Sequence, residues 1–234
     1  MNCESWYFLN KNQIEVFEAE DARLHQIIFE SSAKTVRDAY YLETGKLKPR
    51  YIISKRRLMY LHHILTRNDS ELIKKVYTSQ KLVFTKHDWY QIVQQEKLVF
   101  RIDLTDEEIS LMGKSSFKSL VNKNVHLKSF SDLCLSRKSK TQNIIQNVNI
   151  NKHGYPSMQP YLTSKLLNTR EKKNLFSLRS RDYQVKTNMK SMYEEDMRCR
   201  LCSEEDSCED ERHIILHCSA LSGCGLDEVN YIFC

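Results

Sequence analysis

Residues 50–66 read RYIISKRRLMYLHHILT, and this segment decides the fold class. Its apolar side chains recur at helical spacing: Tyr51, Ile52, Leu58, Met59, Leu61, Ile64 and Leu65. The basic run 55–57 interrupts them on the solvent side. A wide apolar face with this period is typical of an amphipathic helix that packs against other helices. The segment therefore predicts a helix over 50–66 that belongs to a helical array.

The segments before this helix carry the same kind of pattern. Residues 12–30 are predicted to form an amphipathic helix, and residues 34–44 a shorter one that ends at Gly45. Pro49 is expected to break the chain after it. The apolar face of the first helix is formed by residues near helical spacing: Ile14, Phe17, Leu24, Ile27 and Ile28.

Capping signals place the helices that follow. Two capping boxes, Asn68–Glu71 and Thr105–Glu108, predict helix starts, the first running to about Gln80 and the second ending near Gly113. Apolar spacing predicts further helices over 88–98 and 115–133.

The next part of the chain is more polar. Residues 136–151 are rich in Lys, Asn, Gln and Ser and are predicted to be a linker. The pairs Tyr155-Pro156 and Gln159-Pro160 predict an extended or turn segment. Asn168 or Thr169 is expected to cap a last helix that reaches about Arg181.

Composition agrees with a mainly α fold. The 234 residues include only five Gly and three Pro, which disfavours sandwiches and barrels. We predict a helical array over 1–100, a helical basic connector over 101–190, and a small zinc knuckle with its tail over 191–234.

The net charge of +6 is unevenly distributed. Residues 114–190 carry 16 basic and 3 acidic groups, a net charge of +13, whereas residues 199–234 carry a net charge of −6. A basic segment of this size is typical of phosphate binding, although a solvated Lys-rich linker has the same composition. The residues predicted to contact RNA or single-stranded DNA are Lys138, Lys140, Lys152, Lys165, Arg170, Lys172, Lys173, Arg179, Arg181, Lys186 and Lys190.

Aromatic residues are interleaved with these charges. They are Tyr155, Tyr161, Phe176 and Tyr183. Such rings stack on bases in proteins that bind single strands, or they form a local core.

A metal site is predicted near the C-terminus. Six of the eight cysteines fall between Cys199 and Cys234, and four residues follow the pattern Cys199-x2-Cys202-x10-His213-x4-Cys218. Two residues between thiolates allow a tight turn that brings both sulfurs to one ion. A helix that begins at Glu211 or Arg212 would present His213 and Cys218 toward the same point. Three thiolates and one imidazole form a closed tetrahedral shell, so we expect a structural Zn²⁺.

The set of metal ligands has three alternatives. Cys208, His217 and Cys224 lie close enough in sequence to replace one of the four. Unligated thiols are the remaining possibility.

Other functional classes lack a signature. No Gly-rich phosphate loop, nucleophile elbow or His-Glu-x-x-His helix occurs, so no enzymatic site or small-molecule substrate is expected. No apolar stretch approaches the roughly 20 residues of a membrane-spanning helix, and the first residues do not form a signal peptide. We expect an intracellular protein of the cytoplasm or nucleus.

Several segments together resemble a known family. Asn2–Leu9, Ala39–Gly45 and Arg50–Leu65 are similar to the region after the palm in reverse transcriptases of non-LTR retrotransposons, of the Crack and Daphne type. Lys86–Trp89 and the Lys114–Lys118 region are similar to its downstream part. Tyr155–Tyr161 is similar to the same downstream part. In that family a Cys-Cys-His-Cys knuckle ends the polyprotein, at the place where Cys199, Cys202, His213 and Cys218 stand here. The similarity is collinear over nearly the whole chain.

This resemblance implies a thumb-like array over residues 1–100 that grips a nucleic acid backbone, a basic connector and a terminal knuckle. The family's paired palm aspartates are missing from the sequence, so the chain is expected to be a non-catalytic C-terminal fragment. The alternatives are a zinc-dependent adaptor for protein interactions and a non-functional relic of a decayed element.

Overall fold

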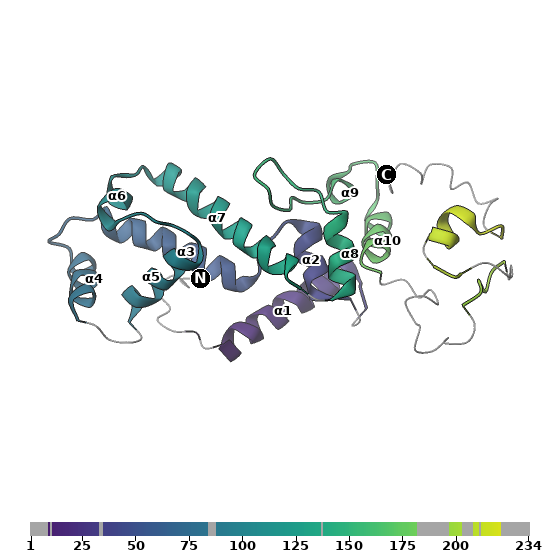
Figure 1. Ribbon diagram of the computed structural model, residues 1–234, viewed down its shortest axis with the longest axis horizontal. Coiled ribbons are helices and arrows are strands. Elements are labelled where there is room, and N and C mark those ends of the chain that lie inside the picture. The colour runs from purple at the N-terminus through teal and green to yellow at the C-terminus, as the bar shows by residue number, and fades with distance from the viewer. Residues whose placement is uncertain are drawn as a thin grey trace.

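The computed structural model describes residues 9, 11–32, 35–83, 88–136, 138–181, 197–202, 208–210 and 212–220. These residues are mainly helical and contain no strand, only two isolated β-bridges. The α-helices (Figure 1) are α1 (Lys11–Phe29), α2 (Arg37–Thr44), α3 (Pro49–Leu65), α4 (Leu72–Leu82), α5 (Trp89–Val99), α6 (Asp106–Leu111), α7 (Lys114–Cys134), α8 (Ser139–Gln146), α9 (Pro160–Thr163) and α10 (Thr169–Arg179). A π-helical turn, η3, spans His213–His217.

The helix predicted from residues 50–66 is the centre of the first hydrophobic core. It is α3, which contacts α1, α4, α5, α6 and α7. Leu58 and Leu61 of α3 are buried with Val93, Phe117 and Val121 from α5 and α7. This core extends from residue 47 to residue 125, so the boundary predicted at residue 100 falls inside it.

A second core joins α1, α2, α8, α10 and the end of α7. Aromatic rings stack through its centre: the centroid of Phe176 lies 4.2 Å from that of Phe29 and 5.4 Å from that of Tyr40. Phe176 is fully buried, so it belongs to the core and does not stack on a base. Segments far apart in the sequence therefore hold α1 and α10 together.

The predicted capping boxes differ in outcome. The Thr105 hydroxyl accepts the Glu108 amide at 3.1 Å, and the Glu108 carboxylate accepts the Thr105 amide at 2.7 Å. Asn168 and Glu171 form the same reciprocal pair at the start of α10, which decides between Asn168 and Thr169. The box at Asn68 is wrong, because α4 begins at Leu72 and its N-cap, Glu71, makes no side-chain capping bond.

Glycine marks the end of α2, and proline marks the start of α3. Pro49 does not break a helix but occupies its first position, where the missing N–H costs nothing. Gly45 has φ of 65°, and a Cβ there would lie 2.8 Å from the backbone of Ser157. Only glycine allows this close approach between the end of α2 and the 149–158 loop.

The linker predicted over 136–151 is wrong, because residues 139–146 form α8. Its buried face is short: Ile144 packs in the second core, and Thr141 donates to Asp38 of α2 at 3.2 Å. Because only a few residues of α8 are buried and the others are polar, its sequence does not show the apolar spacing that is typical of a helix.

The rotation of α1 was not predictable from its apolar residues. Leu24, Ile27 and Ile28, which were expected on the apolar face of the helix, are exposed. The buried face instead carries Ala22, His25 and Phe29, and the rings of His25 and Phe29 stack on Tyr40 of α2. The ring side chains of α1 stack on the tyrosines of α2. The branched aliphatic side chains of α1 do not take part in this stack.

Candidate metal centre

The first half of the candidate centre is a tight turn supported by a short antiparallel contact. Cys199 and Cys202 flank the turn, and a β-bridge pairs Arg198 with Cys208. The Glu209 amide donates to the Met197 carbonyl at 2.8 Å and extends this contact.

An ion pair between the buried carboxylate of Glu209 and the half-exposed side chain of Arg200 closes the same turn. Glu209 is 2% exposed and accepts from the Arg200 amide at 2.8 Å and from its guanidinium at 2.5 to 3.0 Å. These charge-assisted bonds fix the loop that carries the two thiols.

The second half of the centre is η3. The Asp210 carboxylate accepts the His213 amide at 2.6 Å, so an acidic residue caps the start of the turn. The Cys218 amide donates to the His213 carbonyl at 2.7 Å, a bond that spans five residues. A π-helical turn brings residues five apart onto the same side, which an α-helix does not. The predicted helix start at Glu211 lies outside the described residues, and Arg212 is the residue just before η3.

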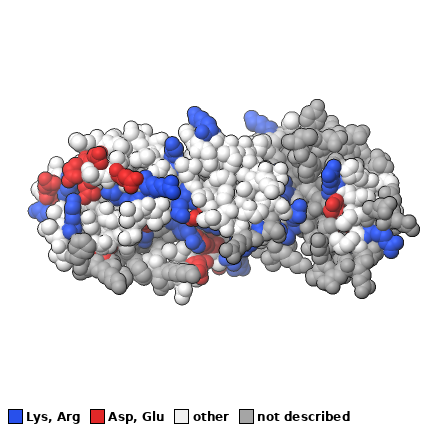
Figure 2. Space-filling model, in the orientation of Figure 1, with Lys and Arg blue, Asp and Glu red and all other residues white. Residues whose placement is uncertain are grey.

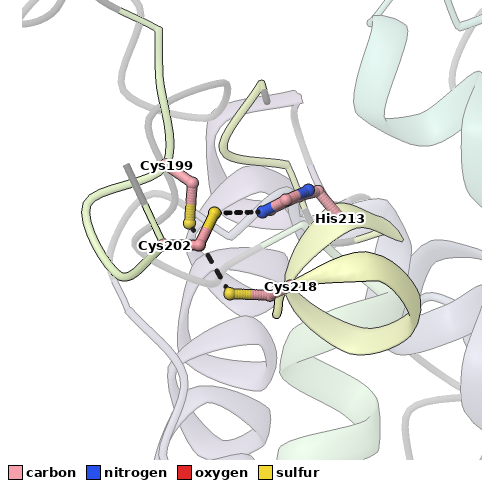
Figure 3. A group of neighbouring side chains, drawn as sticks. All are labelled: Cys199, Cys202, His213 and Cys218. Carbon is pink, nitrogen blue, oxygen red and sulfur yellow. Dashed lines mark hydrogen bonds between the residues drawn. The ribbon is translucent and has the colours of Figure 1, made fainter. Parts of the chain in front are cut away.

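The four predicted ligands converge (Figure 3). Their ligand atoms all lie within 4.8 Å of one another. The sulfurs of Cys199 and Cys218 are 3.9 Å apart, and the Cys202 sulfur is 3.3 Å from Nε2 of His213. Zinc–sulfur bonds of about 2.3 Å in a tetrahedron place two sulfurs about 3.8 Å apart. The separation of the sulfurs fits a shared metal and is far too long for a disulfide.

The environment of the thiols also suits a metal ion. Cys199 and Cys218 are buried, while Cys202 and His213 are partly exposed. Burial raises the pKa of the Cys218 thiol, and the neighbouring thiols raise it further. A bound cation reverses this effect because it stabilises the thiolates. The residues present can therefore hold a metal ion.

The two alternative ligands that lie among the described residues, Cys208 and His217, do not join this cluster. Cys208 is exposed and lies on the bridge with Arg198, and His217 is exposed at the end of η3. Cys224 lies outside the described residues.

The residues predicted to contact nucleic acid fall into three groups. Those on the open surface are Lys138, Lys152, Lys165, Arg170 and Arg181, and Lys172 is partly exposed. Lys186 and Lys190 lie outside the described residues, as does Tyr183. The others are engaged within the protein: Lys140 donates to the Arg181 carbonyl at 3.0 Å, and Lys173 pairs with Glu30.

Arg179 has a structural role that its sequence context did not indicate. Its Nε lies 3.0 Å from each carboxylate oxygen of Glu43, which is fully buried. Its Nη2 donates to the Asn147 carbonyl at 2.7 Å, and Tyr161 donates to Glu43 at 2.9 Å. Arg179 and Tyr161 thus satisfy a buried carboxylate instead of facing solvent.

The structure also brings together a basic group that sequence reasoning missed. Lys55 of α3 is partly buried, and burial, followed by the charges of Lys118 on α7 and of Arg56, lowers its pKa. Burial and the charge of Lys55 lower the pKa of His126 to about 4. The ring of His126 stacks on Tyr155, with centroids 4.6 Å apart. The basic run 55–57 was the only signal in the sequence.

No family model, curated protein or solved structure matches the chain. No helix among the described residues is long and apolar enough to cross a membrane.

Proposed function

We propose that the chain is a non-catalytic, reverse-transcriptase-derived protein of the non-LTR retrotransposon type that binds single-stranded nucleic acid. Its helical array and basic connector supply the binding surface, and the cluster at Cys199 is a structural Zn²⁺ site. The collinear resemblance supports the family, and the distribution of charge over the helices supports the ligand.

Zinc is the metal that the donor set favours. Three thiolates and one imidazole select a soft or borderline cation, and all four positions of a tetrahedron are then filled by protein. A closed shell leaves no position for substrate, so the site stabilises the fold of its module. Such sites contribute on the order of 10 kcal/mol to folding.

One observation carries the proposal of nucleic acid binding: the face formed by α3 and α7 is almost free of acidic residues. The sequence of α3 contains four Lys or Arg and no Asp or Glu, and α7 contains four Lys and one Asp. Figure 2 shows Lys and Arg side chains in a band across the middle of the helical body; the largest group of acidic side chains lies toward α6, and a smaller group lies below the band.

Ion pairs neutralise only part of this charge. Arg50 pairs with Glu18, Arg57 with Glu96, and Lys128 with the single acidic residue of α7. Lys55 and Lys118 form no ion pair within the described ranges, yet they are close enough to repel each other's charge. Phosphate groups relieve such repulsion, and the release of counterions adds to the affinity.

A hairpin-like loop beside α7 adds aromatic surface. The Asn151 amide donates to the Tyr155 carbonyl at 3.0 Å, and Ile150 and Pro156 form a β-bridge. Tyr155 stacks on His126 on one side and, with centroids 6.0 Å apart, on His153. Lys152 at the tip is exposed, so cations and rings alternate there as in surfaces that bind single strands.

A salt titration of binding tests the proposal. The full chain is loaded with Zn²⁺ and titrated with a fluorescent single-stranded RNA and the matching DNA at several salt concentrations. Replacing both Lys55 and Lys118 by Gln should weaken binding to every sequence. The slope of log K against log salt should fall by about 1.4, or about 0.7 for each phosphate that the variant no longer neutralises.

Lys75→Gln on α4 is the matched control, because Lys75 is an exposed lysine on a different helix. It should leave the slope nearly unchanged. No binding at low salt, or equal losses in the control and in the Lys55/Lys118 variant, would refute the proposal. Zinc-dependent capture of a protein that salt and competing RNA do not affect would favour the adaptor instead.

A further inference from the structure

The outer face of α1 carries an apolar row that no part of the described chain covers. Val16, Leu24, Ile27 and Ile28 are 58 to 64% exposed. At 100° per residue these four side chains fall within about a third of the helix circumference, so they form one continuous stripe.

The helix cannot turn this stripe inward. On its inner side, Asp21 accepts a 2.8 Å hydrogen bond from Tyr41, and Glu18 accepts from both Nε and Nη2 of Arg50. The rings of His25 and Phe29 stack on Tyr40. The rotation of α1 is therefore fixed by specific contacts, and the stripe stays outside.

The stripe is larger than the isolated apolar residues elsewhere on the surface. It follows a helix of 19 residues, about 28 Å long at 1.5 Å per residue. Leu111 and Leu166, which are more exposed, stand alone at or near the ends of short helices. Contiguous apolar patches of several hundred Å² are uncommon on monomers and mark interaction sites.

Two charges indicate what covers the stripe. Glu20 lies within the stripe between Val16 and Leu24, and Arg23 lies at its edge. The two side chains form an ion pair at 4.0 Å and remain about 70% exposed, at 67% and 72%. Such an exposed pair contributes little, so both charges are available to a partner. A partner helix would have to present an apolar row with a basic and an acidic residue at matching positions, and α1 itself has this pattern.

We propose that α1 pairs with α1 of a second copy of this chain in antiparallel orientation. A two-fold axis between residues 21 and 22 places Val16 opposite Ile27 of the second copy and Glu20 opposite its Arg23. Parallel pairing in register would instead place Glu20 against Glu20 in the middle of an apolar seam, which is unfavourable. Two such stripes supply an apolar seam with an ion pair on each side of the axis.

Charge reversal and mixing test this pairing on the full Zn²⁺-loaded chain. Sedimentation over a range of concentrations should show a species of twice the 27.8 kDa chain mass. Glu20→Arg alone places two arginines opposite each other, and Arg23→Glu alone places two glutamates opposite each other. Each should shift the equilibrium to the monomer by at least tenfold in dissociation constant.

Mixing the two variants should restore the dimer, because position 20 of one then faces the opposite charge at position 23 of the other at both contacts. A change in helix propensity or a partner other than the chain itself would not be rescued by mixing. Leu111→Glu is the control for an exposed apolar residue and should leave the dimer intact. A monomer at every concentration, or a dimer that either reversal leaves unchanged, or no rescue on mixing, would overturn the proposal.

Discussion

Replacing Arg179 by Met isolates the buried ion pair that joins α2 to α10. Glu43 exposes none of its surface, and it holds two 3.0 Å bonds from the Nε of Arg179 and one 2.9 Å bond from Tyr161. The variant removes the positive charge and leaves a buried carboxylate with one neutral donor. Breaking a buried pair from one side costs about 3–5 kcal/mol. That loss is a large part of the roughly 5–15 kcal/mol typical of a domain.

Urea unfolding followed by far-UV circular dichroism measures this loss. Arg170→Met is the matched control, because Arg170 lies in the same helix, α10, and is exposed. It should change the free energy of unfolding by no more than about 0.5 kcal/mol. Adding Glu43→Gln to Arg179→Met should recover part of the stability, since a neutral amide costs less to bury than an unpaired charge.

The pH dependence of the Arg179→Met variant has a definite sign. Burial raises the pKa of Glu43, and the guanidinium opposes this effect. Without Arg179, the folded protein binds the Glu43 proton more tightly than the unfolded chain does. The deficit relative to Arg170→Met should therefore be smallest below the unfolded Glu pKa of about 4.3 and should grow as pH rises through the raised folded value. A deficit equal to that of the control, or one that does not change with pH, would refute this account of the pair.

Two further predictions concern caps and a histidine. Thr105→Ala and Asn168→Ala should each lower the free energy of unfolding, measured in urea, by about 1 kcal/mol. Asn68→Ala should change it hardly at all, because no capping bond forms there. Equal losses at the three positions would contradict the assigned helix starts. By NMR titration His126 should stay neutral down to a pKa of about 4, and Lys55→Gln should raise that pKa. Since the folded pKa lies below the unfolded value of about 6.5, His126 should reduce stability as pH falls between the two values; titration near 6.5 would show that its ring is not held against Tyr155.

Local signals predicted most of the helices because they act within a few residues. The Thr105–Glu108 box and the apolar period of residues 50–66 both encode their structure directly in sequence. The failures involve contacts between distant segments. Ile144 anchors α8 because it packs against α2, which lies about 100 residues earlier in the chain and supplies the other half of the core. The composition of residues 136–151 does not reveal this contact.

The candidate metal site was predictable because spacing limits which donors can meet. Cys199 and Cys202 needed only a tight turn, and the separation of His213 and Cys218 needed one helical turn, although its π form was not foreseen. The basic residues were less predictable, since charge in the sequence does not reveal partners. Arg179 pairs with the buried carboxylate of Glu43, which lies 136 residues away in the sequence. Lys55 of α3 and Lys118 of α7 lie close enough for their charges to interact.

The most direct test of the central claim is metal analysis of the full chain together with three single variants. Elemental analysis should find one Zn²⁺ per chain, and Co²⁺ in its place should give the visible spectrum of a tetrahedral site with sulfur ligands. Cys199→Ser and Cys218→Ser should lose the metal and the spectrum, whereas Cys208→Ser should retain both. A chain without bound metal, or a Cys208→Ser variant that loses as much metal as Cys199→Ser, would contradict the assignment.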